Sequence, residues 1–491
     1  MTAIKKVIEA VRKKVTPTAR ERKDMEKVID KVVDITKQAI KPLGLGYTLA
    51  GSFIRDTWMP DKKEFEVFIL FPETASREKL EKQGLEVGKG IIDSLNGSYV
   101  IAYAEHPYVR ARVLGYDIDI VPCYKLKSAD KIKSAVDRTP FHNRWISRNL
   151  PEKLASEVRL LKRFAKALGV YGSDTRVQGF SGYLCELLIV HCGSFEALAK
   201  QAAEWEPGRV FIDLQKHHKA GRVPEDLKQR FKNQPLVVID PVDRNRNVAA
   251  AFSPENFARF VLACERFVKR PSEEFFFPVA AKVEPSKLRK CIEERGSKFL
   301  AIEFQRPDVI DDVLWPQLRR TANRLKDIMA GQDFLVLDWA VHSDLADLGR
   351  ELDGNKKQTG KSYIMLELGV WRLPRIRRVV GPPVFIRQRA KEFRKKYQKT
   401  GRVWVEGDRL VSEVKREFLD ARAKLEHSLS DPVKELKAKG IASHIAESIA
   451  GKPGAKCSGS GFKIIEEEQM LGLAAKDRQF GLFLKKYLDR E

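Results

Sequence analysis

Apolar and polar residues alternate along two segments in the first quarter of the chain. In residues 64–71 every second position is apolar, and the positions between them begin with Glu64 and Glu66. Residues 116–124 begin in the same way, with Asp117 and Asp119 at the polar positions. Because residues two apart in a strand project from the same face, the pattern predicts two strands that each place a pair of acids opposite an apolar core.

Helical spacing of apolar residues dominates the middle of the chain, and strand-like runs return after it. A helix is expected near the N-terminus over 19–40, after Pro17. Further helices are predicted over 155–168, 181–192, 194–204, 254–269 and 314–330, and strands over 299–304, 334–337 and 363–368. The last part is predicted to contain a strand at 403–405, helices at 411–427 and 432–450, and a flexible Gly- and Ser-rich segment at 451–461.

A chain of 491 residues is too long for one hydrophobic core. The pattern therefore predicts an α+β multidomain protein. The expected parts are a mixed-sheet domain with helices over 1–145, a helical central domain over 146–270, an α+β domain over 271–400 and a tail over 401–491.

The paired acids indicate a metal site. Like charges on one face of a strand repel each other unless a cation lies between them, and Asp119 would join Glu64 and Glu66 if the two strands pair. Three carboxylates suit Mg²⁺, and two such ions could activate a hydroxyl nucleophile. Gly51 and Ser52 would offer backbone N–H groups and a hydroxyl to phosphate. The alternative is a surface strand with exposed acids beside an ordinary turn.

Charge favours a nucleic-acid partner. The chain has 91 Lys and Arg against 67 Asp and Glu, a net charge of +24. Residues 372–402 contain twelve basic residues and one acid, with aromatic residues between them. This composition suits contact with a phosphate backbone, and the alternative is a solvated helix face. The basic residues expected to bind RNA are Arg375, Arg377, Arg378, Arg387, Arg389, Lys395 and Lys396.

The remaining composition argues against several other classes of protein. The six cysteines form no C-x-x-C pair, so zinc is not expected. Charged residues interrupt every apolar run before it reaches the length of about 20 residues that a membrane helix needs. The N-terminus has no long apolar segment of the kind found in secretory signals. We therefore expect a cytoplasmic protein with reduced cysteines and no membrane contact.

The ordered motifs of the chain resemble those of the archaeal (class I) CCA-adding enzymes, a family with the polymerase-β-like nucleotidyltransferase fold. The resemblance is weakest in the tail. It rests on Gly51-Ser52 and on the segments 64–72, 104–108, 119–124, 134–142, 157–162, 179–188, 240–250 and 306–320. It implies a tRNA nucleotidyltransferase that builds the 3′-terminal CCA from CTP and ATP, with two Mg²⁺ ions, and that binds the acceptor stem and 3′ end of tRNA as a homodimer.

The resemblance also implies roles for single residues. Glu64, Glu66 and Asp119 would be the catalytic metal ligands. The nucleotide would be bound by Gly51, Ser52, Arg55, His142, Lys162, Tyr171 and Arg246. Without the resemblance, Lys162 reads as a solvated lysine, Tyr171 as a packing residue after a helix, and His142 as a loop histidine.

One position departs from the family pattern, which usually has Asp where this chain has Glu66. Glutamate keeps the charge but is longer by one methylene, and Mg²⁺ demands near-ideal octahedral geometry. Two alternatives to an active CCA-adding enzyme therefore stay open: a weakened or inactive tRNA-binding homologue, and a poly(A)-type polymerase on the same fold. Asp56, close to the phosphate-binding residues, would either repel phosphates or pair with Arg55.

Overall fold

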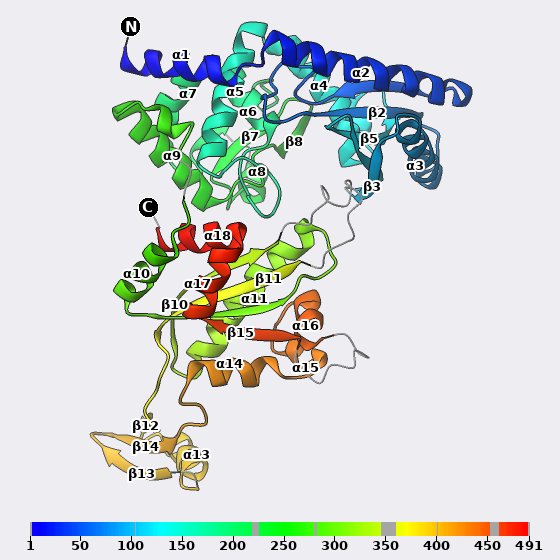
Figure 1. Cartoon of the computed structure of the whole chain (residues 1–491). Helices are drawn as coiled ribbons and strands as arrows, with labels where there is room; N and C mark the ends of the chain where they lie inside the picture. The colour runs from blue at the N-terminus through cyan, green and yellow to red at the C-terminus, as the bar shows by residue number, and fades with distance from the viewer. Residues whose placement is uncertain are drawn as a thin grey trace. The chain divides into compact units, whose positions relative to one another are not determined.

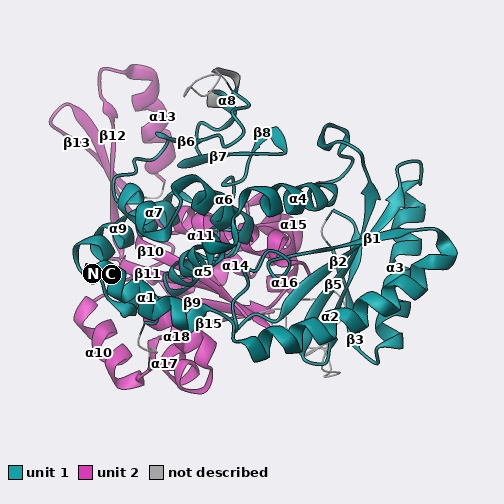
Figure 2. Cartoon of the chain, turned by 90° about the horizontal axis from the view of Figure 1, so that it is seen from above, with its two compact units in different colours: residues 1–280, 347–357 teal, residues 281–346, 358–491 magenta. Residues whose placement is uncertain are grey.

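The computed structural model describes residues 2–103, 105–218, 225–278, 282–344, 360–399, 401–451 and 461–489. Of the segments named above, residue 104, one of the six cysteines (Cys457) and most of the expected flexible segment at 451–461 lie outside these residues. The chain divides into two compact units (Figures 1 and 2). Unit 1 comprises residues 1–280 and 347–357, and unit 2 the remainder.

Unit 1 contains a five-stranded mixed sheet with the order β1-β2-β5-β4-β3. Its strands are β1 (Gly46–Ala50), β2 (Glu64–Pro72), β3 (Ser98–Tyr103), β4 (Pro107–Val113) and β5 (Tyr116–Lys125). Strands β2 and β5 are parallel, and the other pairs are antiparallel. The two acid-bearing strands predicted from the sequence are therefore confirmed, and they are neighbours in the sheet.

Helices α2 (Ala19–Ile40) and α3 (Arg77–Ser94) cover one face of this sheet and leave the acidic face clear of them. Helix α2 begins at a capping box between Thr18 and Glu21, as its N-terminal sequence suggests. Two glycines let α3 approach the sheet closely: a Cβ at Gly84 would lie 2.5 Å from Pro122 Cβ, and one at Gly88 2.8 Å from Val109 Cγ2. The alternating apolar residues of β2 and β5 fill the core beneath these helices.

The helical part of unit 1 has its own core. Its helices are α1 (Ala3–Val15), α4 (Thr139–Asn149), α5 (Glu152–Ala167), α6 (Gly182–Cys192), α7 (Phe195–Ala202), α8 (Glu225–Arg230) and α9 (Pro254–Lys269). Helix α1 packs here, against α5, although it precedes the mixed sheet in sequence. In the described segments no single helix is long and apolar enough to cross a membrane; only α6 with α7, bent by 92°, passes that test as a pair.

Sequence periodicity missed a small sheet in this helical part. Strands β6 (Val210–Ile212), β7 (Leu236–Asp240) and β8 (Asp243–Asn247) form it in that order. Strand β7 lies between Pro235 and Pro241, in a segment where the hydrophobic pattern predicted no element. All five of its residues are buried, so the segment belongs to the core of the unit.

Unit 2 is built on a four-stranded antiparallel sheet with the order β10-β11-β9-β15. The strands are β9 (Lys298–Gln305), β10 (Leu335–Ser343), β11 (Lys361–Val370) and β15 (Phe462–Glu466). Helices α11 (Asp311–Ala330), α14 (Ala421–Leu429), α15 (Val433–Ala438) and α16 (Ser443–Ala450) share one core with it, and α10 (Pro285–Arg295), α17 (Glu467–Lys476) and α18 (Arg478–Leu488) share another. The α+β prediction for this region is confirmed.

A second sheet in unit 2 carries much of the basic segment. It has the order β12-β14-β13, with β12 (Ile376–Pro383), β13 (Gly401–Glu406), β14 (Arg409–Lys415) and helix α13 (Arg387–Tyr397). The predicted helix over 411–427 is wrong, because its first part is strand β14. This strand pairs with both β12 and β13, and the predicted helix is present only from Ala421, where α14 (Ala421–Leu429) begins.

Candidate nucleotidyl-transfer site

The three candidate metal ligands meet on the acidic face of the mixed sheet. Strands β2 and β5 run parallel in a register that sets Glu66 opposite Asp119 and Glu64 opposite Asp117. Glu64 and Glu66 alternate with buried residues of the opposite face, as expected from their spacing. The structure therefore brings Glu64, Glu66 and Asp119 together on one surface of two adjacent strands.

Basic side chains neutralise part of this charge. Arg110 of β4 is opposite Asp119 in the register and donates to both of its carboxylate oxygens at 2.9 Å. This bond to Asp119 raises the pKa of Arg110. Lys62 donates to Glu64. Arg110 also donates to the Tyr108 hydroxyl at 2.7 Å, and burial, with the nearby Asp119 charge, raises the pKa of Tyr108 to about 12.

Among the described residues Glu66 has no hydrogen-bond or ion-pair partner of this kind, and its pKa is raised. Burial, followed by the nearby Asp119 charge, raises the pKa of Glu66 to about 7; the Glu64 charge contributes to the rise, and Arg55 and Lys62 oppose it. A carboxyl with this pKa lies where one more positive charge would be favourable. The charge and the oxygen donors of the cluster therefore fit a divalent cation. In the described residues no three His, Cys, Asp or Glu side chains are already arranged as ligands of one ion.

The turn after β1 supplies the candidate phosphate-binding groups. Gly51 has φ +97°, a conformation that favours glycine, and the Thr57 N–H donates to the Ser52 carbonyl at 2.8 Å to close the loop. Asp56 forms ion pairs with Arg22 of α2 and Arg159 of α5. Of the two possibilities given for Asp56, pairing with Arg55 is therefore wrong. The Asp56 carboxylate pairs with Arg22 and Arg159 instead.

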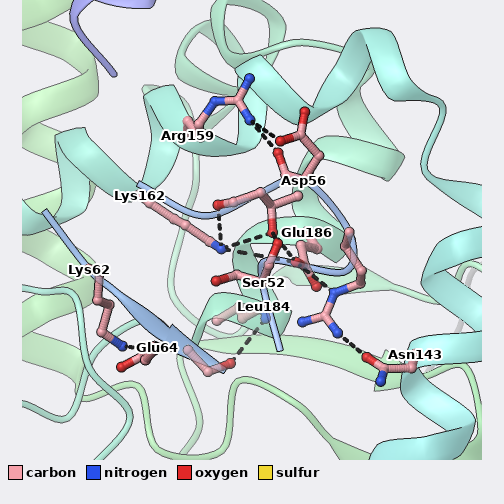
Figure 3. Close-up of polar contacts among 12 residues, drawn as sticks. Ser52, Asp56, Lys62, Glu64, Asn143, Arg159, Lys162, Leu184 and Glu186 are labelled. Atoms are coloured by element: carbon pink, nitrogen blue, oxygen red, sulfur yellow. Dashed lines mark hydrogen bonds and ion pairs between the residues drawn. The ribbon is translucent and has the colours of Figure 1, made fainter. Parts of the chain in front are cut away.

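A carboxylate from the helical part of unit 1, that of Glu186, lies beside Arg55 and Lys162; Figure 3 shows Glu186 and Lys162. Arg55 donates through Nε to Glu186 Oε1 at 3.0 Å and through Nη1 to Asn143. Lys162 is only 2 % exposed and donates to the Thr57 carbonyl at 3.0 Å and hydroxyl at 3.1 Å. The interpretation of Lys162 as a solvated lysine is wrong.

Tyr171 lies beside Lys162. A Cβ added at Gly182 would be 3.4 Å from the Tyr171 hydroxyl and 3.6 Å from Lys162 Nζ, so both side chains border the start of α6. Burial raises the pKa of Tyr171, which keeps its hydroxyl protonated. Lys162 and Tyr171 thus lie together at the start of α6, and Lys162 contacts the loop that carries Ser52 and Arg55.

Asp240, at the end of β7, gathers the other candidate nucleotide ligands. It pairs with His142 Nε2 at 2.9 Å, accepts from Arg246 Nη1 at 2.8 Å and accepts from the Tyr183 hydroxyl at 3.3 Å. The rings of His142 and Tyr183 stack with centroids 4.1 Å apart. Although burial opposes it, the interaction with His142, helped by the Val242 N–H and Arg246, lowers the pKa of Asp240 to about 2.

An open cavity of about 550 Å³ borders this cluster. It is lined mostly by polar side chains, among them Arg138, Ser181, Arg230, Asp243, Asn245 and Arg246. Arg138 and Asp243 form an ion pair across 3.2 Å at its wall. Arg246 therefore links Asp240 to a space that is polar and open to solvent.

The candidate RNA-binding residues lie in the second sheet of unit 2 and in the segment before it. Arg377 and Arg378 are on β12 and pair with Asp333 and Glu406. The others are exposed: Arg375 before β12, and Arg387, Arg389, Lys395 and Lys396 on α13. Helix α13 has one acid among its eleven residues, so this small sheet with its helix presents a strongly basic surface.

Sequence reasoning missed three residues of the site. Glu186 is the single charged residue that interrupts the apolar helix α6, and Asp240 ends the apolar run of β7; both positions carry a visible signal. Arg110 alternates with buried residues of β4, and the two-residue turn at Leu114 and Gly115 joins β4 to β5 as a hairpin in which Arg110 is opposite Asp119, so this contact carried a local signal as well.

Comparison with known proteins agrees with this geometry. Residues 29–142 match a model of the nucleotidyltransferase domain, residues 156–277 the second domain of tRNA nucleotidyltransferases, and residues 295–452 the C-terminal domain of CCA-adding enzymes. The last match covers the second sheet of unit 2 and the helices that follow it.

Curated relatives extend the likeness to nearly the whole chain. A CCA-adding enzyme of Methanocaldococcus jannaschii is 38 % identical over 84 % of this chain and 88 % of its own length. One from Methanosarcina acetivorans is 35 % identical over 98 % of this chain and 97 % of its own, and one from Archaeoglobus fulgidus is 42 % identical over 73 % and 75 %. With its carboxylate face and these relatives, the chain belongs to the CCA-adding enzyme family of nucleotidyltransferases.

Proposed function

We propose that this protein adds or repairs the 3′-terminal CCA of tRNA from CTP and ATP, without a nucleic-acid template. Membership of the CCA-adding enzyme family supports the proposal. The structural observation behind it is the register that places Glu66 opposite Asp119 on adjacent parallel strands, with Glu64 on the same face. A divalent metal and a nucleoside triphosphate are general to nucleotidyltransferases, and we propose Mg²⁺, CTP and ATP here.

In the proposed reaction the 3′-hydroxyl oxygen of tRNA bonds to the α-phosphorus of the nucleotide, and the bond to pyrophosphate breaks. Glu64, Glu66 and Asp119 would hold the metal. The chemistry supplied by two bound Mg²⁺ ions is activation of the attacking hydroxyl and neutralisation of charge on the pyrophosphate. Ser52 and the Gly51 backbone would donate to phosphate oxygens, and Arg55 would bind them as a cation.

Recognition of the base would fall to the cluster around Asp240. Its carboxylate orients Arg246 and His142 by direct contact. An oriented guanidinium offers fixed donors to a base edge, and a pocket that leaves the wrong base's polar groups unpaired discriminates strongly. Lys162 and Tyr171 would support the nucleotide from below the loop, since Lys162 bonds the loop itself.

The tRNA would contact the basic surface of unit 2. Arg375, Arg377, Arg378, Arg387, Arg389, Lys395 and Lys396 would bind its phosphates. Contacts of this kind position the RNA, and the binding they give weakens as salt rises. The acceptor stem and 3′ end are the parts of the tRNA that we propose the protein binds.

Transfer of labelled nucleotides to tRNA ends tests the proposal. With CTP alone, tRNA lacking CCA should gain two C residues, and tRNA ending in CC should gain one A from ATP. A poly(A)-type polymerase would instead extend either end with ATP alone into long tails. No incorporation into either tRNA, by a protein that still binds tRNA, would leave only the reading as a binding homologue.

Assembly as a homodimer and action in the cytoplasm complete the proposed function. We propose both from the family to which the chain belongs. Light scattering at several protein concentrations would check the dimer. A monomer at every concentration would contradict the proposed homodimer.

A further inference from the structure

An acidic residue is buried in the middle of the apolar helix α6. Glu186 is 0 % exposed and is flanked by Leu184, Leu187 and Leu188, which are buried as well. Burial of a carboxylate is unfavourable by several kcal/mol unless cations and donors surround it. An apolar residue would satisfy packing here, so the acid calls for a separate explanation.

Among the described residues, the hydrogen-bond and ion-pair partners of Glu186 belong to the candidate nucleotide site or its loop. Its Oε1 accepts from Arg55 Nε at 3.0 Å and from the Thr57 hydroxyl at 2.6 Å, and lies 4.0 Å from Lys162 Nζ. Lys162 donates in turn to the same Thr57 hydroxyl and to the Thr57 carbonyl. Figure 3 shows Lys162, Glu186 and Asn143 converging on this loop.

We infer that Glu186 is a positioning residue whose charge holds Arg55 and Lys162 in place for the triphosphate. This inference rests on the proposed function of the site. One carboxylate oxygen anchors two cations and the loop hydroxyl, while Oε2 is buried and has no hydrogen-bond partner within the described part of the chain. Arg55 therefore keeps a fixed direction, with Nε and Nη1 held by Glu186 and Asn143.

The charge of Glu186 also sustains the buried lysine. Burial lowers the pKa of Lys162, and the Glu186 charge is the largest influence that opposes this shift. The charged or titratable groups that face Lys162 are Glu186, Cys185, Arg55, Lys62 and Tyr171. Glu186 is the single carboxylate among these groups. Its loss would leave the positive charges of Arg55 and Lys62 near Lys162 without a compensating anion.

Glu157 offers a matched control. It is also a buried glutamate of unit 1, 8 % exposed, and it pairs with Arg12 at 2.7 Å and accepts from the Phe195 N–H at 2.9 Å. Neither partner belongs to the candidate nucleotide site. A merely structural role for Glu186 would make its glutamine variant behave like Glu157→Gln.

The experiment compares Glu186→Gln and Glu157→Gln in the full chain. It measures KM and kcat for CTP with tRNA lacking CCA, the equilibrium Kd for ATP without tRNA, and the thermal midpoint. Glu186→Gln keeps the size and an acceptor oxygen but removes the charge. We expect its KM and Kd to rise about tenfold, the size expected from losing a charged hydrogen bond, with kcat changed by less than about threefold. Glu157→Gln should lower the thermal midpoint and leave KM and Kd unchanged.

The Glu186→Asp variant keeps the charge at a shorter reach, and its KM should lie between those of the wild type and Glu186→Gln. If Glu186→Gln does not fold, the aspartate variant decides. Wild-type KM and Kd in the folded Glu186 variants, or an equal rise in Glu157→Gln, would overturn the inference. If the wild type incorporates no CTP, the proposed function fails, and the ATP titration still tests the role of Glu186.

Discussion

Glu66 and Asp240 are both acids of the candidate site, but their pKa values move in opposite directions. Burial, the Asp119 charge and the Glu64 charge raise the pKa of Glu66 to about 7. Asp240 is buried too, yet His142 and Arg246 lower its pKa to about 2. The carboxylate cluster therefore lacks a positive charge that a metal would supply, whereas Asp240 already has its cations and serves to hold side chains.

The largest effect is expected from a substitution of Asp119, which tests the metal-binding role of the carboxylate cluster. Asp119→Asn removes a metal ligand and a like charge beside Glu66, so CTP incorporation should fall on the order of 10³-fold or more. Because the asparagine can still accept from Arg110, the thermal midpoint should change little. Single-turnover incorporation and calorimetry measure both quantities. Near-normal incorporation would show that the carboxylate cluster is not the catalytic centre.

Asp240→Asn should act on binding and stability instead. It leaves His142 and Arg246 without their counter-charge, so KM for both nucleotides should rise about tenfold and the free energy of unfolding should fall by about 2 kcal/mol. The Asp240 pKa is lowered, so its stabilisation is present above its ordinary value of 3.8 and is lost as pH falls toward 2. Urea unfolding at pH 7 and pH 3 checks this: the difference between wild type and variant should shrink at pH 3. A constant difference would contradict the ion-pair explanation.

The smallest effect concerns metal binding without nucleotide. The Glu66 pKa is raised, so between its ordinary value of 4.5 and about 7 the folded protein holds this proton more tightly than the unfolded chain. This group therefore makes the metal-free protein less stable as pH rises through that range. Mg²⁺ should raise the thermal midpoint more at pH 8 than at pH 6, where most Glu66 is protonated. In the Glu66→Gln variant the rise of the thermal midpoint with Mg²⁺ should be the same at pH 6 and pH 8. If the variant keeps the difference between the two pH values, a group other than Glu66 causes it.

The sequence predicted those parts of the site that depend on one strand or one turn. Alternation along β2 and β5 placed Glu64, Glu66 and Asp119 on their faces, because side-chain direction follows the backbone period. Gly51 and Ser52 were predicted as phosphate-binding groups because they belong to one short turn. The prediction for residues 411–427 failed because pairing with β12 and β13 overrode a local helical spacing.

Contacts between distant segments could not be derived from local patterns. The Glu186 partners come from a loop 129 residues away and from α5. From its own helix Lys162 could be interpreted only as a solvated lysine, because its neighbours form an ordinary amphipathic helix; its expected place in the nucleotide site came from the family resemblance. In the folded protein that face of α5 is covered by the loop that Lys162 holds.

Incorporation of labelled CTP and then ATP into tRNA lacking its CCA, by the wild type and by Glu66→Asp, tests the central claim most directly. We predict that the wild type completes CCA. The shorter side chain of the variant, which matches the family pattern, should raise kcat by less than about 100-fold. Activity in the variant alone would make this chain a disabled member of its family. Absence of incorporation by both proteins, with tRNA still bound, would contradict the claim that the Glu64, Glu66 and Asp119 cluster transfers nucleotides.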